Sequence, residues 1–220
     1  MPHDLARVRA DFDRFAALGV SGGDWYDDLL LSHVPANADR VLDVGCGLGR
    51  LCGALAGRNR RVLGVDVSTA MIERARQECD SPGVEFLNAE FLAHEFGAAR
   101  FSCIITAAAI HHMPLEPAVR KMIDLLERGG TLILHDIRRD AGVVDTVRAH
   151  AALGYQALHR LARTGRLRSP RPVRVAWILH SEGEHYLSFA EAGQLAAALL
   201  PGAQVFYHSM WRYTIVWHKP

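Results

Sequence analysis

Three glycines and an acid stand together where the chain could bend around a small ligand. The segment runs Val41-Leu42-Asp43-Val44-Gly45-Cys46-Gly47-Leu48-Gly49-Arg50, so an apolar run opens into glycines at every second position. Glycine has no Cβ, and alternate glycines therefore let the backbone turn sharply and approach a ligand closely. We expect a helix next, whose first-turn N–H groups would attract a carboxylate or phosphate. The segment thus predicts a site for a ligand with an anionic group.

Acids and histidines follow the later apolar runs of the chain. The two oxygens of Asp66 could accept hydrogen bonds from both hydroxyls of a ribose. Glu90 accepts but cannot donate when it is ionised, so it suits an exocyclic amine. His111 and His112 are adjacent imidazoles, which suit proton transfer near neutral pH.

These side chains need a scaffold that brings distant segments together. Apolar runs predict strands over 41–44, 61–66, 84–91, from 101 toward the histidine pair, and 131–136, with a helix from Pro114 to Leu126. In an open α/β sheet the carboxyl ends of parallel strands face the ligand crevice. The glycines, acids and histidines are therefore expected at one edge of such a sheet.

The pattern of the first strand and turn resembles a known motif. A dinucleotide-binding turn spaces its glycines G-x-G-x-x-G, whereas here the third glycine comes one residue early. G-x-G-x-G with Asp43 two residues ahead resembles motif I of the class I S-adenosylmethionine-dependent methyltransferases. Residues 126–134 resemble the L-x-P-G-G-x-L-x-I pattern of that family, although Glu127-Arg128 replaces the proline. The ending of the chain resembles small stand-alone bacterial members whose substrates are mostly unassigned.

The resemblance implies S-adenosylmethionine as the cofactor and S-adenosylhomocysteine as the product. It implies cofactor contacts from Asp43, Gly45, Cys46, Gly47, Gly49, Asp66, Val67, Met71, Glu90, Phe91 and Ala107. Asp66 would bind the ribose, and Glu90 would hold the adenine amino group, where relatives usually carry Asp. Apolar side chains would form the walls of the adenine slot, although Met71 and Phe91 fit a hydrophobic core equally well.

The resemblance also places the substrate pocket beside the fourth and fifth strands. His111 is the first choice for a general base, and His112 would hold its tautomer or turn outward; a structural role for the pair has equal weight. Asp136 is a third catalytic candidate, or a cap for the next loop. Tyr26 and His135 are candidate substrate contacts.

The predicted fold is an α/β Rossmann-like methyltransferase sheet of seven strands, with helices on both faces and the last strand antiparallel. Residues 1–38 are expected to form an N-terminal helical lid, and 39–220 the methyltransferase domain. Ser188-Phe189-Ala190-Glu191 predicts a capping box and helix, followed by a hairpin of the last two strands.

An arginine-rich insertion at about 140–180 interrupts the domain. It has no acid between Thr146 and Ser181. Its first half has helical spacing from Ala149 to Arg163, and its second half, broken by prolines, predicts a loop or edge. The arginines could recognise an anionic substrate, or they could form a solvated lid.

Composition sets the remaining expectations. The 220 residues include 25 basic and 24 acidic side chains, a net charge of +1, so there is no global field to attract nucleic acid or membranes. The four cysteines show no C-x-x-C pair, and we predict no metal site and a reducing compartment. Neither a signal peptide nor a run of about 18 apolar residues occurs, which favours a cytoplasmic protein. A monomer or homodimer is expected.

The sequence therefore predicts methyl transfer to a hydroxyl, amine or carboxylate of a small molecule, which could be anionic. RNA methylation is the first alternative: no [N/D]-P-P-[Y/F] follows the fourth strand and no Pro-Cys pair occurs, but ribose methylation stays open. A protein that binds the cofactor for a non-methylating reaction is the second.

Overall fold

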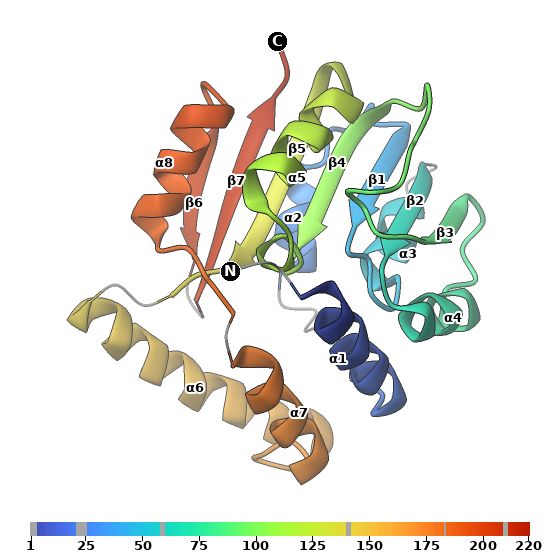
Figure 1. The fold of residues 1–220 in the computed structure, drawn as a ribbon. Helices are drawn as coiled ribbons and strands as arrows, with labels where there is room; N and C mark the ends of the chain where they lie inside the picture. The colour runs from blue at the N-terminus through green and yellow to red at the C-terminus, as the bar shows by residue number, and fades with distance from the viewer. Residues whose placement is uncertain (1–3, 21–25, 58–59, 140–141, 183, 209–210) are drawn as a thin grey trace.

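The structure is a computed structural model, and it describes residues 4–20, 26–57, 60–139, 142–182, 184–208 and 211–220 (Figure 1). Residues 21–25, which the sequence assigns to the lid, and 140–141 of the insertion lie outside the described residues. The strands are β1 (Arg40–Val44), β2 (Arg61–Asp66), β3 (Val84–Asn88), β4 (Phe101–Ala107), β5 (Leu126–Ile137), β6 (Gln204–His208) and β7 (Arg212–His218). The helices are α1 (Leu5–Ala17), α2 (Asp27–His33), α3 (Arg50–Ala56), α4 (Thr69–Glu78), α5 (Leu115–Leu125), α6 (Val143–Thr164), α7 (Arg171–Ser181) and α8 (Phe189–Leu199), with a short 3₁₀ helix, η1 (Ile110–His112).

The described strands form one seven-stranded sheet in the order β3-β2-β1-β4-β5-β7-β6. Strands β1 to β5 pair in parallel, whereas β7 runs antiparallel to both β5 and β6. The predicted sheet with a reversed last strand is thus confirmed, as is the terminal hairpin. The carboxyl ends of β1, β2, β4 and β5 meet at one edge.

Alternating apolar residues place a hydrophobic core on each face of the sheet. Leu42, Ile104 and Leu132 are fully buried with α5 and α8 on one face. Their neighbours Val41 and Cys103 are fully buried on the other face, against α2, α3 and α4. A buried aliphatic side chain of this size contributes about 1.5–3 kcal/mol, so these layers hold the strand ends in place.

Side-chain caps start the helices that flank the edge. The Asp4 carboxylate accepts a hydrogen bond from the Arg7 N–H at the start of α1. Ser68 accepts one from the Met71 N–H at the start of α4. The capping box predicted at Ser188 and Glu191 is confirmed at the start of α8, with both of its hydrogen bonds present. Such caps each contribute about 1 kcal/mol.

Helices α1, α6 and α7 lie beyond the carboxyl edge of the sheet, where the arrows of β1, β4 and β5 point (Figure 1). Phe15 and Ala16 of α1 are buried against Met71 of α4 and Ala176 of α7. The two helices of residues 1–38 therefore lie in different places: α2 packs on a face of the sheet, whereas α1 crosses its edge. That α1 acts as a lid stays a prediction.

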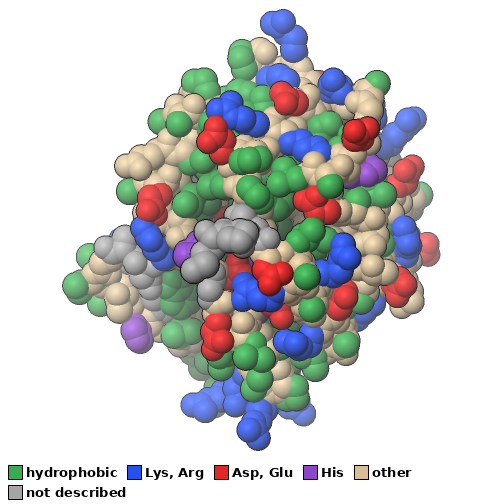
Figure 2. All heavy atoms as spheres, in the orientation of Figure 1, with side chains coloured by type: hydrophobic (Ala, Val, Ile, Leu, Met, Phe, Trp, Pro, Cys, Tyr) green, Lys and Arg blue, Asp and Glu red, His purple; other side chains and the backbone are tan. Residues whose placement is uncertain are grey.

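The proline-broken half of the insertion corrects a prediction. The sequence predicts a loop or edge there, but 171–181 form α7. Pro170 is the N-cap and Pro172 lies in the first turn, where a helix does not need the missing N–H. Lys and Arg side chains gather at the end of the molecule where Figure 1 places α6 and α7 (Figure 2).

Two strand boundaries also differ from the prediction. Strand β3 ends at Asn88 rather than Phe91, because the Glu90 carboxylate accepts hydrogen bonds from the Leu92 and Ala93 N–H groups and closes a turn. Strand β5 begins at Leu126 rather than Thr131. Within the described part of the chain, no helix has the length and apolar character needed to cross a membrane.

Candidate active site

The glycine turn after β1 requires its glycines for two different reasons. All three have positive φ, +77° at Gly45, +52° at Gly47 and +72° at Gly49, a region that other residues rarely adopt. A Cβ on Gly45 would overlap with Ala109, and one on Gly49 would overlap with Phe86. A Cβ on Gly47 would meet nothing within 4 Å. The turn is therefore packed at both ends and open at Gly47.

Asp66 lies directly against this turn. Its Oδ2 accepts a hydrogen bond of 2.9 Å from the Gly47 N–H, and its Oδ1 accepts one of 2.9 Å from the Ser68 N–H. Burial raises the pKa of the Asp66 carboxyl, and these two bonds oppose the rise. The structure thus brings together the glycine and the acid that the sequence assigns to the cofactor.

Asp43 lies beneath the turn rather than in an open site. Its side chain is buried, and its Oδ2 accepts a hydrogen bond of 3.2 Å from the Cys52 thiol. Burial raises the pKa of the Asp43 carboxyl to about 7. Cys46 of the turn is also buried, and Gly64 opposite leaves room for the sulfurs of both cysteines. In this structure Asp43 supports the turn from below.

The predicted walls of the adenine slot are divided between the site and the core. Met71 is buried among residues of α1 and α7, and Phe91 is buried in the core beside α5. Ala107 ends β4 and Val67 follows Asp66, so both lie at the carboxyl edge. The Glu90 carboxylate faces its own turn. Their contacts with a cofactor stay predictions.

His111 and Asp136 form a buried pair across β4 and β5. The imidazole Nδ1 of His111 lies 2.7 Å from Asp136 Oδ1, and the main-chain N–H of His111 donates to Oδ2 at 3.1 Å. The pair is next to the glycine turn, because Gly45 packs on Ala109, two residues before His111. The structure therefore joins two catalytic candidates and places them beside the candidate cofactor site.

His112 lies beneath α1 and α7 rather than facing outward. Its ring centroid is 3.9 Å from that of His111, and Phe12 of α1 contacts its ring edge-to-face at 5.3 Å. Burial lowers the pKa of His112 to about 4, although the nearby Glu184 carboxylate favours the protonated form and opposes this shift. His112 is thus a neutral, buried imidazole at physiological pH.

Residues from α1, from α7 and from the segments around β7 surround the histidine pair, and sequence reasoning missed them. His180 of α7 and Asp11 of α1 approach each other at 3.3 Å beside His112. Tyr186 packs on the His111 ring at 5.0 Å, and Arg212 interacts electrostatically with Asp136. The segment from 146 to 181 has no acidic residue, which points to its arginines as candidate functional residues. Nothing in its sequence indicates that His180 belongs to the site.

The two candidate substrate residues contact each other. The rings of Tyr26 and His135 lie 4.7 Å apart, and Thr214 Oγ1 is 2.9 Å from His135 Nδ1. His208 approaches the same hydroxyl at 2.8 Å from the other side. Burial, with Arg212 nearby, lowers the pKa of His135 to about 3. His135 is therefore a neutral hydrogen-bonding group and a poor proton acceptor at neutral pH.

Comparisons with known proteins agree with this geometry. Residues 41–130, which span β1 to β5, match a family described as a methyltransferase domain. An uncharacterized methyltransferase of Mycobacterium tuberculosis is 35% identical over 108 residues, 49% of this chain and 55% of the relative. These matches indicate a methyltransferase domain over β1 to β5. The chain spans about half the length of the curated relatives that it matches first.

Solved methyltransferases share the whole fold. A Haloferax volcanii methyltransferase, solved in complex with the Trm112 methyltransferase activator, superposes with a TM-score of 0.69 and 18% identity over 97% of both chains. Magnesium protoporphyrin IX methyltransferase from Synechocystis, with bound S-adenosylhomocysteine, gives 0.61 and 17% identity over 99% of this chain and 100% of that one. At these identities the likeness is one of fold.

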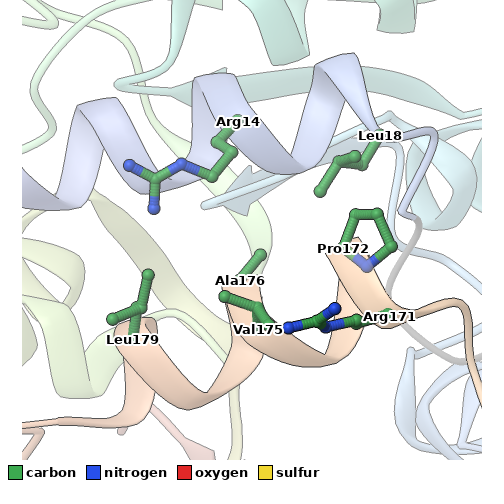
Figure 3. Close-up of a pocket in the computed structure, with 7 residues that line it drawn as sticks. All are labelled: Arg14, Leu18, Arg171, Pro172, Val175, Ala176 and Leu179. Carbon is green, nitrogen blue, oxygen red and sulfur yellow. The ribbon is translucent and has the colours of Figure 1, made fainter.

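The structure also has a groove between α1 and α7. This groove, of about 400 Å³, is lined by Arg14, Leu18, Arg171, Pro172, Val175, Ala176 and Leu179 (Figure 3). The lining is apolar apart from the two arginines, and none of the predicted site residues contributes to it. The groove belongs to the packing of α1 on α7 and is distinct from the site at the strand ends.

Proposed function

We propose that the protein transfers the methyl group of S-adenosylmethionine to a hydroxyl, amine or carboxylate of a small molecule. The observation that carries the proposal is the buried His111–Asp136 pair, which lies beside the glycine turn. A base that is held in one orientation next to a cofactor site is what removal of a proton from an acceptor requires. The match of residues 41–130 to a methyltransferase domain supports this cofactor class.

The residues of the glycine turn fit this cofactor. The open space beside Gly47 lets the backbone approach the ligand, and Asp66 would bind the ribose hydroxyls. When bound, S-adenosylmethionine supplies a methyl group already activated by its sulfonium. The protein therefore has to align the acceptor and take up its proton, and alignment alone can contribute several kcal/mol.

His111 would accept the proton at Nε2, since its Nδ1 faces Asp136. Asp136 is a positioning residue: its two oxygens fix both the ring and the main chain of His111. General-base assistance of this kind typically contributes about 10²–10⁴ in rate. A carboxylate acceptor has no proton to lose, so for such a substrate the pair would act through alignment only.

Enclosure by helices favours a small acceptor over RNA. Phe12 of α1 and His180 of α7 pack against the histidine pair, so the lid covers the strand ends. Arg212, mostly buried near Asp136 and Tyr186, would interact with an anionic group on the substrate. The arginines at 166, 168 and 171 are exposed at the far end of α6 and α7. The O-methyltransferase names of several relatives further favour a hydroxyl acceptor.

The proposal is tested by incubating the protein with radiolabelled S-adenosylmethionine and a whole-cell extract, and by sorting the labelled products by size. Label in low-mass products, with formation of S-adenosylhomocysteine, supports it, and label in RNA supports the alternative. Thermal stabilisation of the protein by S-adenosylhomocysteine is measured in parallel. Stabilisation without any labelled product would indicate a non-methylating enzyme, and stabilisation by a nicotinamide cofactor alone would overturn the cofactor assignment.

A further inference from the structure

Three histidines from two distant parts of the chain meet beneath the lid. His111 and His112 come from η1 at the end of β4, and His180 comes from the last turn of α7. One ring nitrogen of each lies within 4.8 Å of the other two. All three are buried, with exposed fractions of 8%, 8% and 3%. The fold thus brings three imidazoles together in a buried position between η1 and α7.

Two of these rings are held by carboxylates on their outer side. Asp136 Oδ1 lies 2.7 Å from Nδ1 of His111, and Asp11 Oδ2 lies 3.3 Å from Nδ1 of His180. A metal-bound histidine almost always donates its other N–H to a carboxylate, a carbonyl or water, which fixes the tautomer and the ring orientation. Here that outer arrangement is present twice, with Nε2 left for a ligand.

The third ring has one nitrogen without a partner. The Nδ1 of His112 lies 3.2 Å from Glu184 Oε2, whereas its buried Nε2 has no hydrogen-bond partner among the described residues. Buried polar atoms in folded proteins are nearly always satisfied, so a buried Nε2 without a partner, beside two other imidazoles, points to a ligand at this nitrogen.

We propose that His111, His112 and His180 bind a divalent transition-metal ion, with zinc as the cation that this donor set suits best. Neutral imidazoles are preferred ligands of zinc, and three protein ligands leave a fourth position for water or substrate. Asp136 and Asp11 would be the outer carboxylates. The ion would also fasten α7 to the sheet, because His180 is the ligand from the insertion.

The inference goes beyond the proposed function, since metal binding is measurable without a methyl acceptor. In the metal-loaded protein the Nε2 lone pair of His111 is occupied by the cation. A substrate hydroxyl at the fourth position would then have a lower pKa, because the cation stabilises the resulting anion, and its proton would pass to water rather than to His111. For a hydroxyl acceptor the metal would therefore replace His111 as the activating group.

The test is a zinc titration of the full chain after removal of metal with EDTA, followed by calorimetry. We expect one ion per chain. His180→Ala removes a direct ligand and should weaken zinc binding more than about 100-fold, which is more than the loss typical when a carboxylate that orients a ligand is replaced. Asp11→Asn should weaken it by about 10–100-fold. His150→Ala, which removes an exposed histidine of α6, is the matched control and should bind as the unmodified protein does.

Two further measurements keep the result unambiguous. Circular dichroism checks that each variant is folded; if His180→Ala fails to fold, the Asp11→Asn comparison decides. Cobalt(II) in place of zinc should give the visible absorption bands of a low-coordinate nitrogen site in the unmodified protein. Equal zinc affinity in the unmodified protein, Asp11→Asn and His150→Ala, or less than one ion per chain, would overturn the proposal. Stabilisation by S-adenosylhomocysteine is scored separately, so a failed metal titration leaves the proposed methyl transfer intact.

Discussion

Asp136 holds His111 at two points, with one oxygen 2.7 Å from the imidazole Nδ1 and the other accepting from the main-chain N–H at 3.1 Å. Asp136 comes from the end of β5 and His111 follows β4, so two paired strands fix the geometry. A carboxylate on Nδ1 favours the tautomer that carries its proton there, which leaves the lone pair on Nε2. The same nitrogen is the proton acceptor proposed for the metal-free protein and the ligand in the proposed metal site, so the two roles exclude each other in any one molecule.

Replacement of His111 by alanine should separate chemistry from cofactor binding. We expect affinity for S-adenosylhomocysteine to stay within twofold, because the proposed adenosyl contacts are at the glycine turn and Asp66. Methyl transfer should fall by about 10²–10⁴ if the ring acts as a general base. Calorimetry and a single-turnover transfer assay measure the two quantities. Unchanged turnover would assign His111 to packing alone.

Asp136→Asn should slow transfer while the protein stays folded. The amide nearly matches the carboxylate in size, but its N–H₂ cannot accept from His111, so the favoured tautomer reverses and Nε2 loses its lone pair. We expect kcat to fall at least about tenfold, and KM to change less. Glu116→Gln, which alters an exposed carboxylate on α5, is the control variant and should leave both constants unchanged. Equal kcat in the two variants would contradict the positioning role.

Asp66→Ala should weaken S-adenosylmethionine binding. Hydrogen bonds to a charged group contribute about 1.5–3 kcal/mol, and at least that loss is expected by calorimetry. Asp66 also accepts from the Gly47 and Ser68 N–H groups, so part of the loss would come from a looser turn. Asp80→Ala removes an exposed acid after α4 and serves as the control. Equal affinity in both variants would refute the assignment of Asp66 to the ribose.

Gly47→Ala should weaken cofactor binding with only a modest loss of stability. The added Cβ meets nothing within 4 Å, so the cost is backbone strain at a φ of +52°, about 1–2 kcal/mol. Gly129→Ala is a matched control, because Gly129 has a φ of +75° and equal space but lies away from the site. Both variants should lose similar stability in urea, and Gly47→Ala alone should lose affinity. Equal affinities would show that the opening at Gly47 faces no ligand.

Much of the scaffold was predictable because its signals are local or follow from parallel strands. Asp66 and Gly47 are 19 residues apart, yet both follow strands whose carboxyl ends share an edge, so their contact could be expected. The cap at Ser188 depends on four consecutive residues and was equally visible. The meeting of His111 with Asp136 follows the same logic across β4 and β5.

The lid contacts could not be predicted in this way. Asp11 and His180 are 169 residues apart, and they meet because α1 and α7 dock over the strand ends, which no local pattern specifies. Prolines misled the prediction for α7, since Pro170 and Pro172 stand at the start of a helix where the same residues would break its middle. The predicted absence of a metal site followed from cysteine spacing alone, which gives no information on three histidines that converge only in the fold.

Asp43 should make the stability of the protein fall as the pH rises. Burial raises the pKa of its carboxyl to about 7 from 3.8, so between these values the folded state binds a proton that the unfolded state has lost. In Asp43→Asn this cost of ionisation is absent, and the amide oxygen can still accept from the Cys52 thiol. Urea unfolding should be measured from pH 4 to 8. The free energy of unfolding of the variant, relative to that of the unmodified protein, should rise by up to about 1.4 kcal/mol per pH unit and level off above pH 7.

Asp39→Asn is the control for this experiment. A hydrogen bond from Ser102 lowers the pKa of Asp39, so the folded state favours its ionised form, and the variant loses stability relative to the unmodified protein only as the pH rises through the acid range up to about pH 4. Above about pH 5 Asp39 is ionised in both states, so its difference curve should be flat where the Asp43→Asn curve still rises. Parallel curves for Asp43→Asn and the unmodified protein would mean that Asp43 ionises normally beneath the turn, and that water reaches it there.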